Sequence, residues 1–303
     1  MPSLPSQYKA KQTRAKPIVA DLANSELIYG IQPVLAALQQ RRREVYGLYL
    51  PSSFDSDLPR TRLEEIAWLA QRQNVPVARV PQAKLDASVG GQVHQGAVLK
   101  VSKVDPPRIK AISPFVDGSY TVTAQGCEPV TLRPRRLLPL WLCLDGIQDP
   151  RNLGSIIRSA LFFGVDAVLT PHSGVCRVMP IVSKVSCGAA ECTAIYRAGD
   201  MAGVLKGARK NGWSVVSATA SHAPGPAPAP ALVPVGEVPR LAHPTILVIG
   251  SEEAGVSEGI AALSDMNVHI PACAELPPYI DSLNAGVATG ILLSSLKFEG
   301  EQQ

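Results

Sequence analysis

The sequence lacks the residue patterns of several common binding sites. Its six cysteines include no Cys-x-x-Cys pair and have no histidine cluster beside them, so a zinc site is not expected. No Gly-x-Gly-x-x-Gly follows a first strand and no Walker sequence occurs, which leaves dinucleotide and nucleoside-triphosphate sites without support. No apolar run reaches the length of a membrane span, because the longest candidate, 285–296, is interrupted by glycines, a threonine and serines.

What the chain does contain is enough apolar sequence for two folded domains. It has 303 residues, of which 46% are hydrophobic, with a net charge of +4. This mildly basic balance is compatible with an anionic partner such as RNA and does not require one. The irregular spacing of the cysteines in a long chain favours reduced thiols.

The first twenty residues are basic, with Lys9, Lys11, Arg14 and Lys16 and no acid before Asp21. They also lack the apolar core of a secretory signal. We expect residues 1–25 to be a disordered leader, either an organelle transit segment or a plain basic arm.

Residues 26–103 predict one small α/β domain. Ile28, Ile31, Val34 and Leu38 recur at helical spacing, and Arg41 to Arg43 are expected to close that helix. Further strands are expected at 45–50, 75–80 and 97–101, around a helix at 63–70.

Residues 104–138 have weak periodicity and predict a linker with one short strand near 120–123. Arg133, Arg135 and Arg136 at its end are interpreted either as phosphate contacts or as solvated arginines. Trp68 and Trp213 are expected to fill the core, and the scattered His172, His222 and His243 to lie at the surface.

A second domain is expected over residues 139–299. The pattern predicts strands at 140–144, 165–170, 193–197, 213–218, 245–250 and 266–271, and helices at 153–163, 178–187, 200–211, 257–264 and 283–297. This alternation predicts a mostly parallel sheet covered on both faces. The Ala/Pro-rich residues 222–240 are expected to form a mobile surface loop.

Three loops of this domain are candidates for a single site, because open α/β sheets bind ligands at the carboxyl ends of their strands. In the first loop, Asn152 is the expected N-cap of a helix that carries Arg151 and Arg158 on one face, which suits a phosphate or a ribose. The alternative is that Asn152 only caps and that Arg158 pairs with a surface acid.

The second loop runs from Gly250 to Gly255 around Glu252 and is, taken alone, a weak signal. The third ends in Ser282, an expected N-cap, and in Asn284, whose place before an apolar helix is not explained by capping alone. We expect the three loops to converge.

Together these stretches resemble the motifs of the SpoU/TrmH group of RNA ribose 2′-O-methyltransferases in the SPOUT superfamily. The resemblance rests on an ordered set: Leu142-Cys143-Leu144-Asp145-Gly146, Asn152-Leu153-Gly154 with Arg158, Ser183 to Glu191, Gly250-Ser251-Glu252 with Gly255, and Ser282-Leu283-Asn284. Residues 26–103 are similar to the L30e-like RNA substrate-binding domain of the family through Tyr29-Gly30, Val34, Ala37-Leu38 and His94-Gln95-Gly96. Residues 141–152 and the Leu276-Pro277-Pro278 insert are most similar to members that methylate a guanosine ribose of mitochondrial large-subunit rRNA.

The resemblance implies a trefoil-knotted α/β domain, an exception to the rule that chains do not thread loops. It implies S-adenosylmethionine held by Gly250, Ile270 and Leu283, and a homodimer with its sites near the subunit interface. It places Asn152, Arg158, Glu252, Ser282 and Asn284 at the RNA substrate, with Arg158 as the family's proposed base. No metal or membrane contact is implied, and a mitochondrial matrix location is expected.

The sequence departs from the family at two positions. Gly286 stands where the family often has serine and lowers helix propensity, and Glu253 replaces a usual glycine and must tolerate the angles of the turn. Two other functions are weighed: a catalytically weak RNA-binding factor in ribosome assembly, and a tRNA ribose methyltransferase. The retained motif residues argue against the first, and the L30e-like domain argues against the second.

Overall fold

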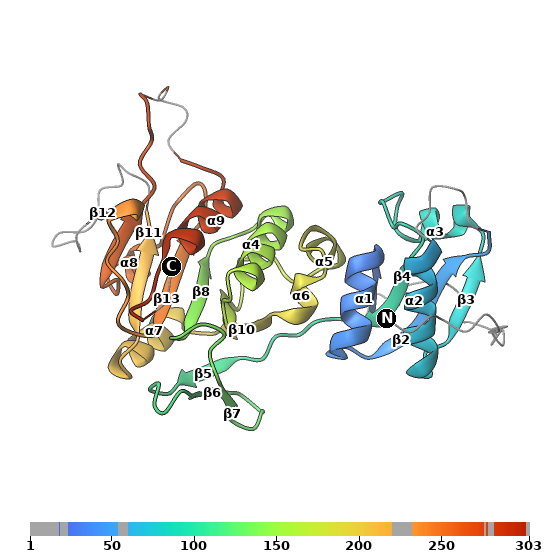
Figure 1. Ribbon diagram of the computed structural model, residues 1–303, viewed down its shortest axis with the longest axis horizontal. Coiled ribbons are helices and arrows are strands. Elements are labelled where there is room, and N and C mark those ends of the chain that lie inside the picture. Colours follow the sequence, from blue (N-terminus) through green and yellow to red (C-terminus); the bar gives the residue numbers. More distant parts are fainter. Residues whose placement is uncertain are drawn as a thin grey trace. The chain divides into compact units, whose positions relative to one another are not determined.

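The computed structural model describes residue 18 and residues 24–53, 60–219, 232–275, 277 and 282–300. The chain divides into two compact units, Met1–Val104 and Asp105–Gln303 (Figure 1). The expected leader, apart from residue 18 and the last residues before the first strand, lies outside the described residues, as do Leu276, Pro278 and Asp281. None of the described helices is long and apolar enough to cross a membrane.

The first unit is a four-stranded sheet with three helices. The chain order is β1 (Ser25–Tyr29), α1 (Ile31–Gln40), β2 (Val45–Pro51), α2 (Arg60–Arg72), β3 (Val77–Val80), α3 (Gln82–Ser88) and β4 (Val98–Ser102). The strand order is β1-β4-β2-β3, and only the β2–β3 pair is parallel. Ile28, Val34, Leu48 and Leu99 are fully buried and pack with the apolar face of α2 in one core.

The prediction of a helix starting near Ile28 was wrong. Ile28 belongs to β1, and the helix begins only at Ile31, after Gly30 with a φ of 99°. The helical periodicity gave a wrong prediction at Ile28 because the conformation of β1 is determined by its pairing with β4, a strand far along the chain, and not by local preference.

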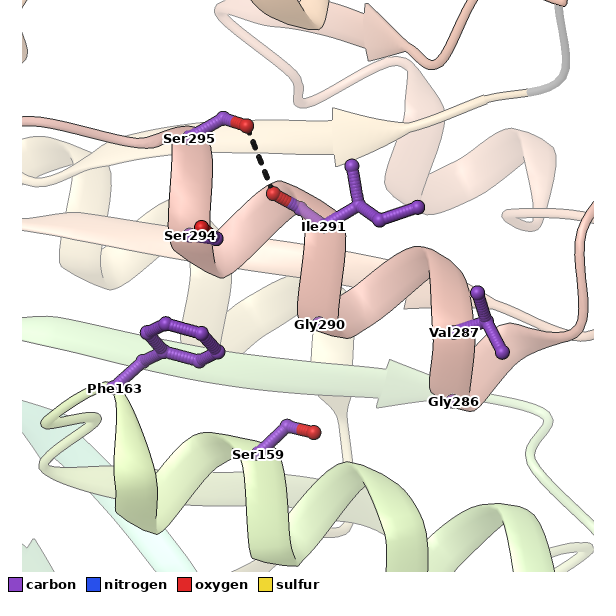
Figure 2. A pocket seen from close by; sticks show the side chains of 8 residues that line it. All are labelled: Ser159, Phe163, Gly286, Val287, Gly290, Ile291, Ser294 and Ser295. Atoms are coloured by element: carbon purple, nitrogen blue, oxygen red, sulfur yellow. Dashed lines mark hydrogen bonds between the residues drawn. The ribbon is translucent and has the colours of Figure 1, made fainter.

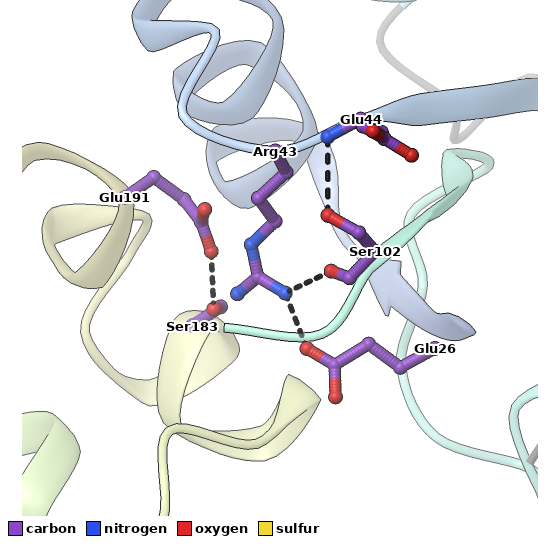
Figure 3. A network of polar contacts seen from close by, with 6 residues as sticks. All are labelled: Glu26, Arg43, Glu44, Ser102, Ser183 and Glu191. Carbon is purple, nitrogen blue, oxygen red and sulfur yellow. Dashed lines mark hydrogen bonds and ion pairs between the residues drawn. The ribbon is translucent and has the colours of Figure 1, made fainter. Parts of the chain in front are cut away.

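Arg43 does not close α1 as expected. The helix ends at Gln40, and the C-cap Arg41 adopts a left-handed conformation with a φ of 53°. The Arg43 side chain is buried, pairs with Glu26 and donates from Nη1 to the Ser102 carbonyl at 3.1 Å (Figure 3). It therefore ties the start of β2 to β1 and β4, since a buried guanidinium requires such partners.

The second unit is built on a seven-stranded sheet. Its strands are β8 (Leu140–Asp145), β9 (Ala167–Pro171), β10 (Ala194–Ala198), β11 (Ser214–Ala218), β12 (Leu232–Pro234), β13 (Thr245–Gly250) and β14 (Met266–His269). All neighbours are parallel, in the order β10-β9-β8-β13-β11-β14-β12. Central strands β8 and β13 are almost wholly buried, as expected of a parallel sheet covered on both faces.

All six predicted strands of this unit are present, and the predicted α/β class is confirmed. The seventh strand, β12, was missed: it is a three-residue edge strand within the 222–240 insert, followed by the 3₁₀ helix η1 (Val235–Glu237). Residues 220–231 of that insert lie outside the described residues.

Helices cover the two faces of this sheet (Figure 1). The helices are α4 (Pro150–Phe162), α5 (Pro180–Val185), α6 (Ala189–Cys192), α7 (Met201–Lys210), α8 (Glu258–Ala261) and α9 (Ala285–Ser295). Helix α4 packs with α5, α6 and α9, whereas α7 packs with α8 and β11. The predicted helices are all found, although the one predicted at 178–187 is shortened to α5, and the separate helix α6 follows it.

The predicted linker at 104–138 is instead a three-stranded antiparallel sheet of the second unit. It comprises β5 (Ile109–Ile112), β6 (Tyr120–Ala124) and β7 (Val130–Leu132). Tyr120 is buried and its hydroxyl accepts from Trp141 Nε1 at 2.9 Å, with Trp213 at the same cluster. The short strand predicted near 120–123 is confirmed as β6, whereas β5 and β7 are too short to show a period in the sequence.

Arg136, considered above as a phosphate contact, has a structural role. Its Nη2 donates to the Leu296 carbonyl at 3.0 Å and its guanidinium lies 4.8 Å from the Phe298 ring centroid. Arg136 thereby anchors the segment after α9.

Candidate active site

The three candidate loops meet at the carboxyl edge of the main sheet. Strands β8 and β13 are neighbours, and Asp145 pairs in register with Gly250 at their ends. From β8 the chain enters α4, and from β13 it enters the turn that holds Glu252. Helix α9 packs directly against α4 and brings its amino end to both.

A hydrogen-bond network joins Asn152, Glu252 and Asn284. The amide nitrogens of Asn152 and Asn284 both donate to Glu252 Oε1, at 3.0 and 2.7 Å, and Asn284 Nδ2 also lies 2.9 Å from Asn152 Oδ1. The backbone N–H of Ala285 donates to the same carboxylate oxygen at 3.0 Å. One ionised oxygen thus accepts three donors from two other loops, which makes these bonds charge-assisted.

Both predicted N-caps were displaced by neighbouring residues. Helix α4 is capped by Asp149, whose carboxylate accepts from the Arg151 N–H, with Pro150 in the first turn. Helix α9 is capped by Asn284, which accepts from Gly286 at 3.0 Å, and not by Ser282. Because Asp149 does the capping, the Asn152 side chain remains available to reach the other two loops.

The turn after β13 requires glycine at its two ends. A side chain at Gly250 would place its Cβ only 2.1 Å from the Gly255 carbonyl carbon, and Gly255 has a φ of 65°. Ser251 and Gly255 exchange two backbone hydrogen bonds of 3.0 Å across the turn. Glu253 does not have a positive φ, so the expected strain at this departure from the family is absent.

Asp145 is a positioning residue that the sequence analysis did not single out, although it lies in the first motif. Its Oδ2 accepts from the Ser257 N–H at 2.7 Å, which fixes the far end of the turn after β13 to the end of β8. Next to it, Gly146 has a φ of 82°, and a Cβ there would lie 3.3 Å from Ser251 Cβ. The two loops are therefore held together by backbone geometry.

Arg158 lies on α4 and is exposed. No ion pair joins it to an acid among the described residues, so the alternative of a surface salt bridge finds no support there. Ser282 and Leu283 precede the α9 cap and are both exposed, and Ile270 is half-buried directly after β14. Hydrogen bonds bring together Asn152, Glu252 and Asn284, whereas Arg158, Ile270 and Leu283 form no hydrogen bond with them in the part of the chain that the structure describes.

The motif from Ser183 to Glu191 packs against α4. Ser183 Oγ donates to Glu191 Oε1 at 2.7 Å (Figure 3). A Cβ at Gly154 would come within 2.7 Å of Val185 Cβ, so α5 and α4 pack at a distance that only glycine permits. This motif fixes the helix that carries Asn152 and Arg158.

Residues at the ends of three adjacent strands are candidates to contact a nucleoside-type cofactor. Gly250 ends β13, Thr219 follows the Ala218–Ile249 pair on β11, and Ile270 follows β14. Thr219 Oγ1 is buried and finds no hydrogen-bond partner among the described residues. An unsatisfied buried hydroxyl is costly, and a polar ligand at this edge would satisfy it. Within the described part of the chain, no group of three or more His, Cys, Asp or Glu side chains could hold a metal.

Comparison with known proteins gives matches over both units. Residues 139–294 match the SpoU rRNA Methylase family, and residues 27–107 match the family described as RNA 2′-O ribose methyltransferase substrate binding. The chain is 36% identical over 273 residues to human "rRNA methyltransferase 1, mitochondrial", covering 89% of this chain and 72% of that protein. It is 30% identical over 274 residues to the 23S rRNA (guanosine-2′-O-)-methyltransferase RlmB of Pseudomonas putida, covering 90% and 96% of the two chains.

A solved structure confirms the fold. The AdoMet-bound rRNA methyltransferase from Sinorhizobium meliloti superposes with a TM-score of 0.64 at 20% identity, covering 91% of this chain and 87% of that one.

Proposed function

This chain belongs to the SpoU rRNA methylase family, and from that membership we propose that it methylates the 2′-hydroxyl of a guanosine ribose in large-subunit rRNA, using S-adenosylmethionine. The network of Asn152, Glu252 and Asn284 is the observation that carries this proposal, because it assembles motif residues from three distant loops at one edge of the sheet. The names of two relatives, one mitochondrial and one specific for guanosine, support the substrate. The mitochondrial matrix is the proposed compartment.

Methyl transfer requires the ribose 2′-oxygen and the methyl carbon to be held close and in line. When bound, S-adenosylmethionine would supply a methyl group from its sulfonium and would leave as the neutral thioether, while the ribose 2′-hydroxyl would lose its proton. We propose that Gly250, Ile270 and Leu283 hold this cofactor at the strand ends, with Thr219 Oγ1 as a further contact.

The role assigned to Arg158 is to stabilise the negative charge that develops on the ribose 2′-oxygen. A guanidinium does not give up its proton near neutral pH, so Arg158 stabilises the alkoxide and holds the adjacent phosphate, whose oxygen takes the proton. The rigid network of Asn152, Glu252 and Asn284, with Ser282 beside it, positions the ribose.

The Arg158→Ala variant tests this assignment. We expect methyl transfer to in vitro-transcribed large-subunit rRNA to fall at least about a hundredfold, the loss typical of one removed charge-stabilising donor. The affinity for S-adenosylmethionine, measured by calorimetry, should stay within about twofold of the wild-type value. The reason is that the Arg158 guanidinium stabilises charge that develops only in the transition state. Lys210→Ala, which removes an exposed positive charge from α7, is the control.

Other outcomes identify the alternatives. Loss of cofactor affinity in Arg158→Ala would contradict the assigned role. A wild-type protein that binds rRNA but transfers no methyl group would be an assembly factor, and one that methylates only tRNA would be the tRNA enzyme. Mapping 2′-O-methyl sites across all transcripts after gene deletion distinguishes these and identifies the nucleotide.

We further propose a homodimer built on α4 and α9. A shallow groove of about 510 Å³ between these helices is lined by Ser159, Phe163, Gly286, Val287, Gly290, Ile291, Ser294 and Ser295 (Figure 2). Val287 on α9 and Phe162 on α4 are 51% and 82% exposed, and a second copy bound at these helices would cover them. A second copy bound here would lie beside Asn284.

The Val287→Glu variant tests the dimer. We expect it to sediment as a monomer in analytical ultracentrifugation, whereas Val130→Glu, at a similarly exposed valine on β7, should leave the wild-type mass unchanged. A monomeric wild-type protein would contradict the proposal. The trefoil knot and the RNA-binding role of residues 26–103 also remain proposals.

A further inference from the structure

A cluster of basic side chains lies at the carboxyl ends of β9 and β10, outside the network described above. His172 follows the last residue of β9, Arg197 is on β10, Arg108 directly precedes β5, and Arg177 is in the loop between β9 and α5. Arg108, His172 and Arg177 are exposed. We call these four residues the basic edge.

The basic edge is built on paired backbone. Arg108 and Arg197 form a parallel β-bridge, and the His172 N–H donates to the Ala198 carbonyl at 2.9 Å. Arg197 is held further by Asp105, 2.5 Å away, and by the Pro106 carbonyl, 2.9 Å away. The side chains of Arg108, His172 and Arg197 therefore start from paired backbone, whereas Arg177 lies in the loop that follows β9.

Positive charge exceeds negative charge at this place. Of the three guanidinium groups, only that of Arg197 is paired with a carboxylate among the described residues, and this carboxylate belongs to the largely exposed Asp105. Arg108 Nη2 donates to His172 Nε2, and this nitrogen can accept a hydrogen bond only when the imidazole is neutral. Partial desolvation, and then the charges of Arg108, Arg197 and Arg177, lower the pKa of His172. Like charges held together without acids are favourable only when an anion neutralises them.

The basic edge is connected to the active-site loops. Strand β9 is the neighbour of β8, and the Cys176 N–H, next to Arg177, donates to the Ile147 carbonyl at 3.0 Å. Ile147 lies in the segment that leads from β8 into α4. The basic edge and the Asn152–Glu252–Asn284 network therefore both lie at the carboxyl ends of the strands of one sheet, and the loops after β8 and β9 connect them.

We propose that Arg108, His172, Arg177 and Arg197 form a phosphate-binding surface that holds the RNA backbone flanking the methylated nucleotide. This inference rests on the proposed function, because an RNA whose ribose reaches Glu252 and Asn284 must continue past the strand ends beside them. Guanidinium groups suit the task, since they bind phosphate oxygens in a bidentate way. The contacts carry no base information, so the surface supplies affinity and register and leaves nucleotide choice to other residues.

The test compares two double variants of the full chain. In Arg108→Gln/Arg177→Gln, two exposed charges of the basic edge are removed while Arg197 keeps its bonds to Asp105 and Pro106. The control is Lys206→Gln/Lys210→Gln, which removes two exposed charges from the carboxyl-terminal half of α7. Both variants lower the net charge by the same amount, and thermal unfolding checks that both fold.

Dissociation constants for in vitro-transcribed large-subunit rRNA are measured across a series of KCl concentrations. Each lost contact to a single-stranded phosphate lowers the slope of log Kd against log salt by about 0.7. The basic-edge variant loses two contacts, so we expect its slope to be about 1.4 lower than that of the wild type. At about 0.15 M salt this corresponds to a Kd and a KM for rRNA raised about tenfold. The kcat and the S-adenosylmethionine affinity should match wild type, because these residues contact neither reacting atom.

Each other result contradicts the inference. Equal changes of slope in both variants would show a general charge effect, and an unchanged slope in the basic-edge variant would show that no phosphate binds there. A lowered kcat with unchanged KM would indicate disturbance of the active site. If wild-type protein binds rRNA but does not methylate it, the proposed function fails, while the difference in slope still tests the surface.

Discussion

At the scale of single residues, Glu252 organises the site. Its Oε1 accepts from the Asn152 and Asn284 amides and from the Ala285 N–H, so one side chain fixes the amino ends of α4 and α9. Glu253, next to it in sequence, is exposed and has no such role in the described contacts. The two adjacent carboxylates form a natural matched pair for experiment.

We predict that Glu252→Ala destabilises the fold and abolishes activity. Three donors lose their acceptor, but the network is partly open to water, so the free energy of unfolding should fall by about 1 kcal/mol, the low end for such losses. Glu252→Gln retains an acceptor oxygen and should lose less stability, while methyl transfer still falls because the charge-assisted bonds are weakened. Denaturant unfolding and methyl transfer to rRNA measure both effects.

Glu253→Ala is the control and should resemble wild type in both measurements. If Glu252→Ala were as stable and as active as Glu253→Ala, the network would be incidental.

Trp68 also shows what a residue's type leaves open. It was predicted to fill the core, yet its side chain is 39% exposed, with the Arg72 guanidinium 4.8 Å from its ring centroid. Trp213, by contrast, is buried as predicted, and its Nε1 donates to the Ser113 carbonyl. Trp68 stands between Ala67 and Leu69, and Trp213 between Gly212 and Ser214, so the sequence neighbours do not predict which ring is buried; the positions of other elements decide it.

At the scale of elements, the pairing of α4 with α9 explains a residue that looked unfavourable. Gly286 lowers helix propensity, but a Cβ there would lie 2.8 Å from Ser155 Oγ and 3.0 Å from Ser155 Cβ. One turn on, Gly290 faces Ser159. Small residues on both helices let α9 approach α4 closely, and this approach delivers Asn284 to Asn152.

We predict that Gly286→Ala destabilises the protein although alanine is the better helix former. The close contact should cost about 1–3 kcal/mol, as in overpacked cores, against a gain of about 1 kcal/mol in helix propensity. Chemical denaturation measures the net loss, and methyl transfer should fall with it because the Asn284 cap moves.

The control for this helix change is Gly207→Ala on α7, where a Cβ would meet nothing within 4 Å. This variant should be more stable than wild type by about 0.5–1 kcal/mol, the propensity difference alone. Equal stabilisation by both changes would show that α4 and α9 are not tightly packed at Gly286.

At the scale of the whole molecule, the chain consists of two units with separate cores. The apolar core of the first unit runs from Ile28 to Val101, and a main core of the second from Ile109 to Leu263. The β5–β7 sheet contributes Tyr120 and Val122 to the second core. The second unit therefore begins near Asp105, well before the boundary at 139 expected from the sequence.

We predict that a fragment of residues 105–303 folds alone and a fragment of residues 139–303 does not fold well. The longer fragment keeps β5–β7 over Trp141 and Trp213, whereas the shorter one exposes both rings to water. Cooperative melting by circular dichroism distinguishes them. The 105–303 fragment should bind S-adenosylmethionine in calorimetry and lose most activity on rRNA, since residues 26–103 are proposed to bind the substrate. Equal melting of the two fragments would contradict the importance of β5–β7.

The sequence by itself determined the elements whose signal is local. Strands such as β8 and β13 are continuous apolar runs, and α4 has a regular apolar stripe, so their positions followed from periodicity. The ordered motifs identified the family and named Asn152, Glu252 and Asn284 before any contact was known.

Only the tertiary structure decided which groups those residues contact. It placed Ile28 in a strand paired with β4, made a sheet of the expected linker, gave the caps to Asp149 and Asn284, and set Gly286 against Ser155. Most of these outcomes depend on partners far away along the chain, as Asn152 and Asn284 are, which differ by 132 in residue number. Local periodicity holds no information on such partners, because the free energy that selects them comes from packing and hydrogen bonding between distant segments.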